Sequence, residues 1–238
     1  MAYILHLESS TSVCSVALAL NGELVDLMES NEGQNHAKLL SVFAADLLSR
    51  NNLRPEQLEA VAVSEGPGSY TGLRIGVSLA KGLCYANQIP LIAVSPLQSM
   101  CEQVISQHKQ LGVDELTDCL LVPMIDARRM EVYTATYALP NHLIKAVSSE
   151  IINEQSFLDE LSSKKILFFG NGAEKCKTHL THPNATIIPG IETSAQFMCQ
   201  LAWNAFQNKQ FADLAYFEPF YLKDFIAGTP KKNILTGQ

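Results

Sequence analysis

A hydroxyl-rich segment near the N-terminus has the residue types to hold a phosphate group or a metal ion. It lies at the turn between the first two expected strands and reads Glu8-Ser9-Ser10-Thr11-Ser12. A nucleotide site in such a turn needs an acidic metal ligand and a glycine that lets the backbone approach the phosphates. Glu8 supplies the acid, but Ser10 stands where the glycine would be. We therefore interpret the segment as a polar hairpin turn, with Glu8, Ser9 and Thr11 as weak candidates for a nucleotide-type loop.

A glycine-rich segment between an expected strand and an expected helix is the second candidate phosphate loop. It runs Gly66-Pro67-Gly68-Ser69-Tyr70-Thr71-Gly72-Leu73-Arg74-Ile75-Gly76. Backbone N–H groups at a helix start can hold an anion. The spacing G-x-G-x-x-x-G misses the dinucleotide fingerprint by one residue, and the segment has no Lys-Ser/Thr pair of a P-loop. Without a ligand, Gly72, Gly76 and Ala80 share one helix face and would let another helix approach closely.

A shorter glycine turn occupies the corresponding place in the second half of the chain. It reads Gly170-Asn171-Gly172, and a tight strand-to-helix turn explains it without a ligand. Gly66, Gly68, Gly170 and Gly172 complete the weak nucleotide-type positions.

The sequence offers little for nucleophilic or metal catalysis. It contains no G-x-S-x-G elbow and no H-E-x-x-H motif. His36 precedes an expected helix and has no carboxylate partner nearby in sequence. Cys176, His179 and His182 form C-x-x-H-x-x-H, which lacks the fourth ligand of a stable zinc site. We therefore predict no catalytic residue and no metal ligand.

The elements that would position these segments follow one order twice, βββαβαβα. In the first half we expect strands at 4–8, 13–20, 23–28, 58–64 and 89–94, and helices at 36–50, 71–87 and 96–109. In the second half we expect strands at 120–125, 131–137, 143–152, 166–169 and 185–188, and helices at 156–161, 172–180 and 193–208. The βαβ steps imply parallel pairing and helices over the sheet faces. The predicted fold is α/β with two lobes, 1–110 and 111–220, a cleft between them, and a C-terminal tail at 221–238.

The helix at 36–50 is apolar over about half of its circumference, which is wider than one core-facing stripe requires. Leu39, Leu40, Phe43 and Leu47 belong to this broad face. Either a partner covers the surplus, or the helix is buried between the sheet and a neighbouring helix of its own lobe. The pattern alone leaves both interpretations open.

Composition limits the classes of function that are open to the chain. The 238 residues are 47% hydrophobic and carry a formal net charge of -7, so we expect RNA contact to be indirect. No apolar run approaches the ~20 residues of a membrane span, and the N-terminus lacks the pattern of a secretory signal. The six widely spaced cysteines are typical of small core residues. A cytoplasmic protein without membrane contact is expected.

Read together, these segments resemble the TsaB (YeaZ) family along nearly the whole chain. The resemblance rests on Ile4-Leu5-His6-Leu7-Glu8-Ser9-Ser10-Thr11, the glycine-rich segment at 66–76, Ala80-Lys81-Gly82-Leu83, Ile125-Asp126-Ala127-Arg128, Gly170-Asn171-Gly172-Ala173 and Pro219-Phe220-Tyr221-Leu222. Glu8 in place of the more usual Asp and Tyr70 in place of Phe are mild departures.

The resemblance implies a two-lobed actin-like ATPase fold (ASKHA, ribonuclease H-like) and a role in making threonylcarbamoyladenosine (t6A) in transfer RNA. It implies a non-catalytic subunit that dimerises with and activates the catalytic paralogue TsaD, together with the ATPase TsaE. The partners, and not this chain, would use ATP and a metal, and the chain would meet transfer RNA only indirectly. Family members pair through the two helices that correspond to 36–50 and 71–87, and homodimers can form through the same surface. The implied contact residues are His36, Leu39, Leu40, Phe43, Leu47, Gly72, Leu73, Ile75, Gly76, Leu79, Ala80 and Leu83.

The alternative function is an enzyme on the same fold, either a stand-alone ATP-dependent phosphotransferase or an M22-type peptidase. A fold by itself grants no activity. The phosphotransferase would need ATP at Ser9 to Thr11 and at Gly170 to Ala173, and the peptidase would need a metal or nucleophile that the sequence does not offer.

Overall fold

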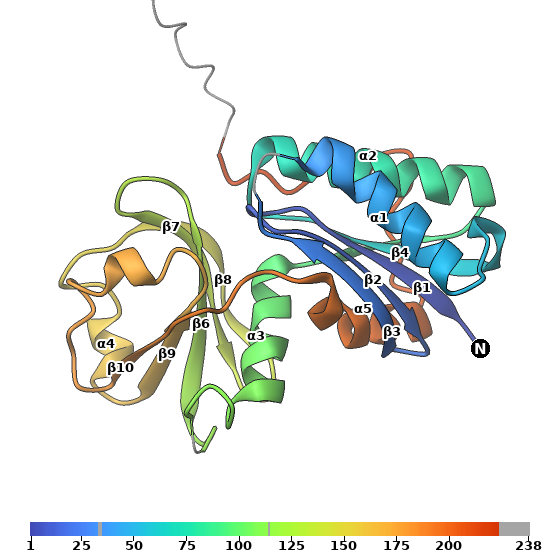
Figure 1. Cartoon of the computed structure of the whole chain (residues 1–238). Coiled ribbons are helices and arrows are strands. Elements are labelled where there is room, and N and C mark those ends of the chain that lie inside the picture. Colours follow the sequence, from blue (N-terminus) through green and yellow to red (C-terminus); the bar gives the residue numbers. More distant parts are fainter. Residues whose placement is uncertain (33–34, 114, 224–238) are drawn as a thin grey trace, which may run out of the picture.

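The computed structural model describes residues 1–32, 35–113 and 115–223, and within them two five-stranded mixed sheets stand side by side (Figure 1). The first sheet has the order β3-β2-β1-β4-β5 and the second has the order β10-β9-β6-β7-β8. Both therefore place the first strand of their half at the centre and a parallel βαβ step on one side. The duplicated α/β prediction is confirmed. Of the predicted tail, residues 224–238 lie outside the described residues.

The first sheet contains strands β1 to β5. Their bounds are β1 Tyr3–Glu8, β2 Cys14–Leu20, β3 Glu23–Ser30, β4 Leu58–Ser64 and β5 Leu91–Val94. β1 pairs antiparallel with β2 and parallel with β4. The Asn21-Gly22 turn joins β2 to β3, and both residues have positive φ, 52° and 88°. Two successive left-handed residues give the turn whose twist matches that of the strands.

The second sheet repeats this arrangement. Its strands are β6 Cys119–Asp126, β7 Glu131–Ala138, β8 His142–Ile151, β9 Lys165–Phe169 and β10 Ala185–Ile188. β6 pairs antiparallel with β7 and parallel with β9. β6 is buried along all but its last residue, as a central strand covered on both faces should be.

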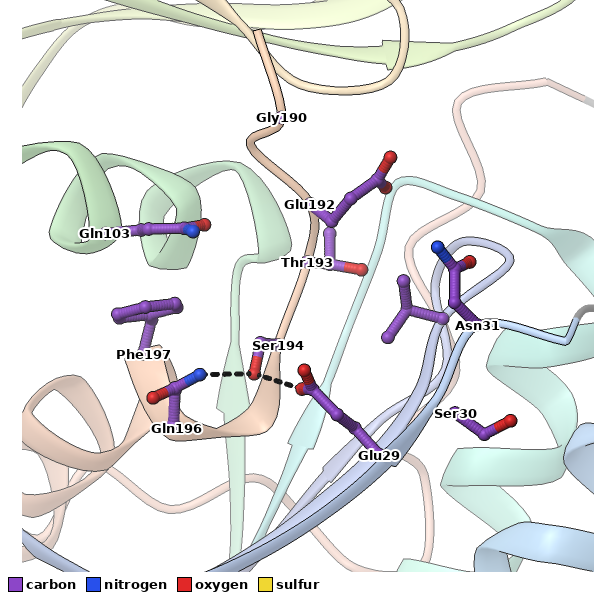
Figure 2. Close-up of a pocket in the computed structure, with 11 residues that line it drawn as sticks. Glu29, Ser30, Asn31, Gln103, Gly190, Glu192, Thr193, Ser194, Gln196 and Phe197 are labelled. Carbon is purple, nitrogen blue, oxygen red and sulfur yellow. Dashed lines mark hydrogen bonds between the residues drawn. The ribbon is translucent and has the colours of Figure 1, made fainter. Parts of the chain in front are cut away.

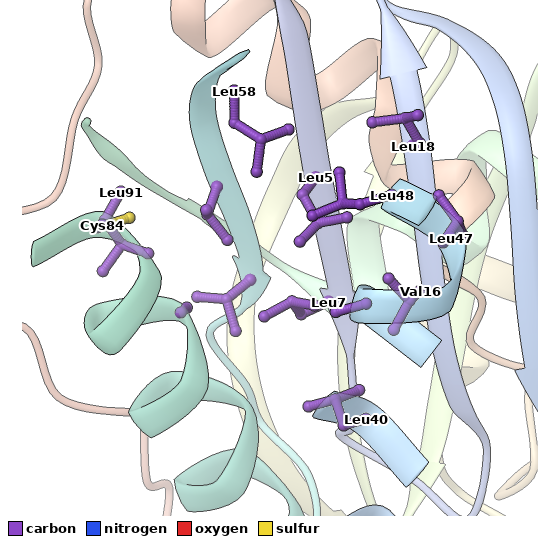
Figure 3. Close-up of a cluster of buried hydrophobic side chains, with 14 of the residues drawn as sticks. Leu5, Leu7, Val16, Leu18, Leu40, Leu47, Leu48, Leu58, Cys84 and Leu91 are labelled. Carbon is purple, nitrogen blue, oxygen red and sulfur yellow. The ribbon is translucent and has the colours of Figure 1, made fainter. Parts of the chain in front are cut away.

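Helices α1 (His36–Arg50) and α2 (Tyr70–Asn87) cover one face of the first sheet. Leu5 and Leu7 of β1 point to this face, because alternate residues of a strand share a side. They pack with Leu40 and Leu47 of α1 and with further residues of α2 and β4 (Figure 3). All six cysteines of the chain are buried, as predicted for small core residues.

Two further helices exchange places between the two halves of the chain. α3 (Pro96–Gln107) packs its buried residues, including Leu97 and Val104, against the second sheet. α5 (Cys199–Gln207), with the short 3₁₀ helix η3 (Ala195–Met198) before it, packs against Ile4 and its neighbours on the first sheet. Figure 1 shows α5 under the first sheet and α3 beside the second. We call each sheet, together with the helices that pack on it, a packing unit. The two packing units differ from the sequence ranges 1–110 and 111–220, because those ranges would keep each helix with the sheet of its own half.

The sequence prediction is wrong about the helix at 172–180. The structure has only the 3₁₀ turn η2 (Glu174–Cys176) there, and α4 (Leu158–Leu161) is likewise a single short turn. The segment from 170 to 183 contains two glycines, two threonines and a closing proline, which are weak helix formers. A short helix of such residues does not offset the cost of its nucleation. Ala173, Cys176 and Leu180 are still buried against the sheet, so the segment covers the face without being helical.

A further short 3₁₀ turn, η1 (Pro55–Gln57), precedes β4. Among the described residues, no helix is both long and apolar enough to cross a bilayer.

Candidate partner interface

Helix α1 begins at His36, whose side chain is tied to the turn beneath it. The Nε2 atom of His36 lies 3.1 Å from the carbonyl oxygen of Val13 in a buried hydrogen bond. This contact fixes the start of α1 over the end of the turn between β1 and β2. The predicted contact residue His36 therefore has a structural role inside the lobe.

The broad apolar face of α1 divides between core and surface. Leu40 and Leu47 are fully buried, whereas Leu39 and Phe43 are half-buried and Val42 is 46% exposed. The prediction that Leu40 and Leu47 contact a partner is corrected here, because their side chains are already used to cover the sheet. Leu39 and Phe43 keep part of their surface open.

Helix α2 divides in the same way. Its N-terminus is capped by Ser69, whose side chain accepts a 3.3 Å hydrogen bond from the Gly72 backbone N–H. Leu73 and Ala80 are fully buried against the sheet, so their assignment as partner contacts is also corrected. The half-buried flank consists of Ile75, Leu79 and Leu83, which recur every four residues.

We use the name α1/α2 surface for the partly open apolar residues of the two helices. They are Leu39, Val42, Phe43, Ile75, Leu79 and Leu83. Half-buried aliphatic and aromatic groups on two helices give a surface on which a partner could bury further apolar area. The contact prediction for these members stays a prediction, since no partner is present.

The small residues of α2 face the chain's own turn and not another helix. A Cβ at Gly72 would lie 2.1 Å from the Ser9 carbonyl oxygen, and a Cβ at Gly76 would lie 2.3 Å from Ser9 Oγ. Ser9 Oγ donates a hydrogen bond of 2.9 Å to the Gly72 carbonyl oxygen. The expectation that a helix approaches Gly72 and Gly76 is wrong, because the turn after β1 fills this space and removes both glycines from any external contact.

The same turn fills the glycine loop ahead of α2. The Ser69 N–H donates a hydrogen bond of 2.6 Å to the Ser10 carbonyl oxygen. A Cβ at Gly68 would lie 2.3 Å from that same oxygen. The space that a glycine would open for a phosphate is thus occupied by backbone, and the Ser69 donor is already used.

Glu8 is the last residue of β1. It is fully buried, and its Oε1 accepts a 2.6 Å hydrogen bond from the Ser10 N–H. Burial raises the pKa of this carboxyl group. Thr11 Oγ1 lies 2.7 Å from Thr193 Oγ1, which closes the turn from the other side. Glu8, Ser9 and Thr11 therefore do not fit a metal and nucleotide phosphate in this arrangement.

The glycine turn of the second half has a packing role as well. The Gly172 N–H donates a 2.9 Å hydrogen bond to the Met124 carbonyl oxygen. Gly170 has a positive φ of 101°, and a Cβ there would lie 2.4 Å from the same carbonyl oxygen. Asn171 Oδ1 accepts a 2.9 Å hydrogen bond from the Asp126 N–H. The interpretation as a tight turn accounts for both glycines.

The C-x-x-H-x-x-H motif does not gather into a ligand set. Cys176 is buried and its Sγ contacts the Gly172 carbonyl oxygen at 3.3 Å. Burial raises the pKa of its thiol, which disfavours the thiolate that a metal needs. Within residues 1–32, 35–113 and 115–223, no three His, Cys, Asp or Glu side chains lie together as a metal site would require.

A segment that follows α5 returns to the first lobe, and the sequence did not predict this docking. We call residues 212–223 the strap. The Ala212 N–H donates a 2.9 Å hydrogen bond to the Leu91 carbonyl oxygen, and the Phe220 N–H donates one of 2.7 Å to the Glu65 carbonyl oxygen. Lys81 Nζ donates to the carbonyl oxygens of Ala215 and Phe217, each at 3.1 Å. The run Pro219-Phe220-Tyr221-Leu222 was recognised as a feature of the family, but no periodic pattern indicated where it would pack on the fold.

The strap also explains Gly66. This residue has a φ of 110°, and a Cβ on it would lie 2.7 Å from the Phe220 carbonyl oxygen. The Tyr221 ring lies 4.8 Å from the Tyr70 ring, and the Arg74 guanidinium lies 4.1 Å above the Tyr70 ring. The strap therefore occupies one flank of α2, and Ile75, Leu79 and Leu83 lie on the opposite flank.

Comparison with known proteins agrees with this architecture. The family model described as TsaD, tRNA N6-adenosine threonylcarbamoyltransferase, matches residues 30–237. The chain is 30% identical over 226 residues to a Bacillus subtilis protein named tRNA threonylcarbamoyladenosine biosynthesis protein TsaB, with 92% of this chain and 93% of that protein covered. A Haemophilus influenzae protein of the same name is 26% identical over 230 residues, with 93% of each chain covered.

A solved structure described as YeaZ from Pseudomonas aeruginosa superposes with a TM-score of 0.77 at 27% identity and covers 93% of this chain and 100% of its own. The two-lobed actin-like fold is thereby confirmed together with the family prediction. The chain belongs to the TsaB (YeaZ) family, within the wider family that the TsaD model describes.

Proposed function

We propose that this chain is a non-catalytic subunit of the machinery that synthesises t6A in transfer RNA, and that it dimerises with and activates the catalytic paralogue TsaD. The proposal takes its pathway from the names of the TsaB relatives and of the matching family model. The assignment of catalysis to TsaD, and not to this chain, rests on the arrangement of this chain's own residues.

The observation that carries the proposal is that the nucleotide-type loop after β1 packs tightly against the glycine-rich segment and α2. Ser9 and Ser10 fill the space beside Gly68, Gly72 and Gly76, and Glu8 is buried beneath them. Electrostatic catalysis needs donors that are free to meet the reacting group. In this lobe the backbone donors of Ser69 and Gly72 are already bonded within the chain, so a catalytic role is assigned to a partner.

The α1/α2 surface supports the pairing. Val42 is 46% exposed, and Phe43 and Leu79 are half-buried. A paralogue with the same fold presents its own two helices to such a surface, which gives a pseudo-symmetric pair. Activation then requires that the α1/α2 surface bind the active arrangement of TsaD more tightly than the inactive one.

The remaining members of the complex follow from the same division. ATP and the metal act through the partners, TsaE joins the pair as its ATPase, and a homodimer of this chain uses the α1/α2 surface when TsaD is absent. The net charge of -7 fits a subunit that meets transfer RNA indirectly, because phosphate contact needs a basic surface. A role in the modification of transfer RNA implies a cytoplasmic location.

Transfer of labelled threonylcarbamoyl to unmodified transfer RNA tests the proposal. TsaD, TsaE, ATP and the enzyme that makes the adenylate are supplied with this chain, without it, and with this chain in place of TsaD. Activity only when TsaD and this chain are both present is the expected result. Activity that is indifferent to this chain, or that this chain gives without TsaD, refutes the proposed role.

Two matched variants separate the pairing surface from general damage. Val42→Glu places a charge on α1, and Val25→Glu places the same charge on β3, at similar exposures of 46% and 44%. Val42→Glu should abolish co-purification with TsaD and the stimulated transfer, and Val25→Glu should preserve both. Equal behaviour of the two folded variants would show that α1 is not the docking helix.

A further inference from the structure

A polar pocket lies between the two packing units, away from the α1/α2 surface (Figure 2). Its volume is about 250 Å³, which equals roughly eight water molecules at about 30 Å³ each. The walls come from three places: Glu29 and Asn31 at the end of β3, Gln103 on α3, and the segment 190–197 that links β10 to η3. We call this space the interlobe pocket.

The polar lining of the interlobe pocket is rich in hydrogen-bond acceptors. Glu29 and Glu192 supply carboxylates, and none of the described residues that line the pocket is a lysine, an arginine or a histidine. Phosphate or carboxylate ligands would be repelled by this lining. The charge of the pocket lining is therefore negative, which is opposite to the charge that a site for nucleotide phosphates requires.

Two of these acceptors are buried and unused. Gln103 Oε1 and Glu192 Oε2 are shielded from solvent and have no hydrogen-bond partner among the described residues. Figure 2 shows Gln103 extending from α3 toward the segment that carries Glu192 and Thr193. A buried carboxylate oxygen without a donor is costly, and burial accordingly raises the pKa of Glu192. A ligand that donates hydrogen bonds would remove this cost.

Glu29 is held in place by its own donors. Ser194 Oγ donates a 2.8 Å hydrogen bond to Glu29 Oε2, and Ser15 Oγ donates one of 3.2 Å to the same atom. These bonds hold the carboxylate against the segment 190–197. Glu29 thus gives the pocket a fixed negative charge, and Glu192 and Gln103 offer the free acceptor positions.

The structure assigns to the interlobe pocket a small organic cation, a primary alkylammonium ligand whose –NH₃⁺ group donates to the unpartnered carboxylate oxygen of Glu192. An ammonium group carries three donors and no acceptor, which matches the lining. Val13 and Phe197 supply apolar wall for a short alkyl chain. The ligand would contact both packing units, so its binding would favour the arrangement in which they are closed on each other.

Titration of the full chain with n-butylammonium, followed by amide chemical shifts at constant ionic strength, tests the assignment. n-Butanol serves as the neutral analogue and butyrate as the anion. Saturable shifts at the interlobe pocket with n-butylammonium, at least tenfold weaker with n-butanol and absent with butyrate, are expected. No saturable shift, or equal affinity for the alcohol, overturns the assignment.

Variants identify the acceptors. Glu192→Gln should weaken n-butylammonium binding at least tenfold, and Glu56→Gln, at an exposed position on η1, should leave it unchanged. Gln103→Leu changes another part of the pocket wall without altering the charge of the chain, and it should affect binding less than Glu192→Gln. Unchanged affinity in Glu192→Gln overturns the assignment. The outcome is independent of the proposed pairing with TsaD, because none of these residues lies on the α1/α2 surface.

Discussion

The hydroxyl of Ser9 lies against the first turn of α2, where its Oγ donates a hydrogen bond of 2.9 Å to the carbonyl oxygen of Gly72. The contact joins residues that are 63 positions apart. It connects the turn after β1 with the helix that lies next to it over the sheet. It also explains why the glycine-rich segment needs small residues without any ligand.

Substitution of Gly72 should therefore be far more harmful than substitution of Gly82 on the same helix. In Gly72→Ala the new Cβ would lie 2.1 Å from the Ser9 carbonyl oxygen, whereas at Gly82 no heavy atom lies within 4 Å. We expect Gly72→Ala to lower the free energy of unfolding by about 2 to 3 kcal/mol or more. Gly82→Ala should raise it by about 0.5 to 1 kcal/mol, because alanine is the better helix former. Urea denaturation of the two variants checks this, and similar effects would contradict the packing.

Truncation on α1 should distinguish core from surface. Leu40 is fully buried, and Leu40→Ala should cost about 2 to 5 kcal/mol of unfolding free energy through lost burial and a residual cavity. Val42 is 46% exposed, and Val42→Ala should change the same quantity by no more than about 0.5 kcal/mol. Thermal melts of both proteins supply the measurement. A mild effect at Leu40 would mean that this helix face is not packed on the sheet.

His6 should make the fold sensitive to acid. It is fully buried on β1, and this desolvation lowers its pKa to about 4. Between pH 6.5 and 4 the unfolded chain binds a proton at His6 that the folded chain does not, so stability is complete above pH 6.5 and falls with pH. Between pH 7 and pH 5 the loss should be about 2 kcal/mol.

Urea denaturation at pH 7 and pH 5 measures the contribution of His6. His6→Leu should remove most of this pH dependence, and the same substitution at the exposed His142 should preserve it. If His6→Leu and the parent chain lose equal stability between the two pH values, the acid sensitivity arises at other groups.

Lys81 should hold the strap onto the first lobe. Its ammonium group donates to the carbonyl oxygens of Ala215 and Phe217. Lys81→Met should cost about 1 to 2 kcal/mol of local stability, which is roughly five- to thirtyfold in the opening equilibrium. Chymotrypsin should then cut at Tyr216 and Phe217 correspondingly faster while the melting temperature changes little.

A matched variant on the other lobe controls for the loss of a charge. Lys177→Met removes an exposed lysine that lies beside η2. Its cleavage rate in the strap should equal that of the parent chain. Equal acceleration in both variants would show that the strap does not depend on Lys81.

Most of the fold could be predicted from the sequence because the strands are short apolar, β-prone segments and the turns are marked. Leu5 and Leu7 point to one face of the sheet and Ile4 points to the other, and both faces are buried, which is why β1 is a nearly continuous apolar run. The order of elements followed from this pattern. The exchange of α3 and α5 between the sheets could not be predicted, since each helix is apolar enough to cover either sheet and only the path of the chain decides.

The candidate interface was predictable in place but not in detail. The positions of Leu40 and Leu39 differ by about 100° around α1, and both are leucine, so the sequence cannot say which one the sheet covers. Leu40 is buried because it is the residue that faces the sheet in the folded chain. The Ser9 turn and the strap are similarly non-local, because their contacts with α2 join residues that are far apart in the sequence.

The placement of α5 has a consequence for synthesis on the ribosome. The face of the first sheet that contains Ile4, Ala17 and Ile92 is covered by residues of η3 and α5, including Ala195 and Ala202. A nascent chain that has completed β5 must therefore carry an uncovered apolar sheet face until about one hundred further residues have emerged. Partly made chains of this kind are prone to aggregate. The emergence of α5 thus sets the moment at which this apolar face of the first sheet can be covered.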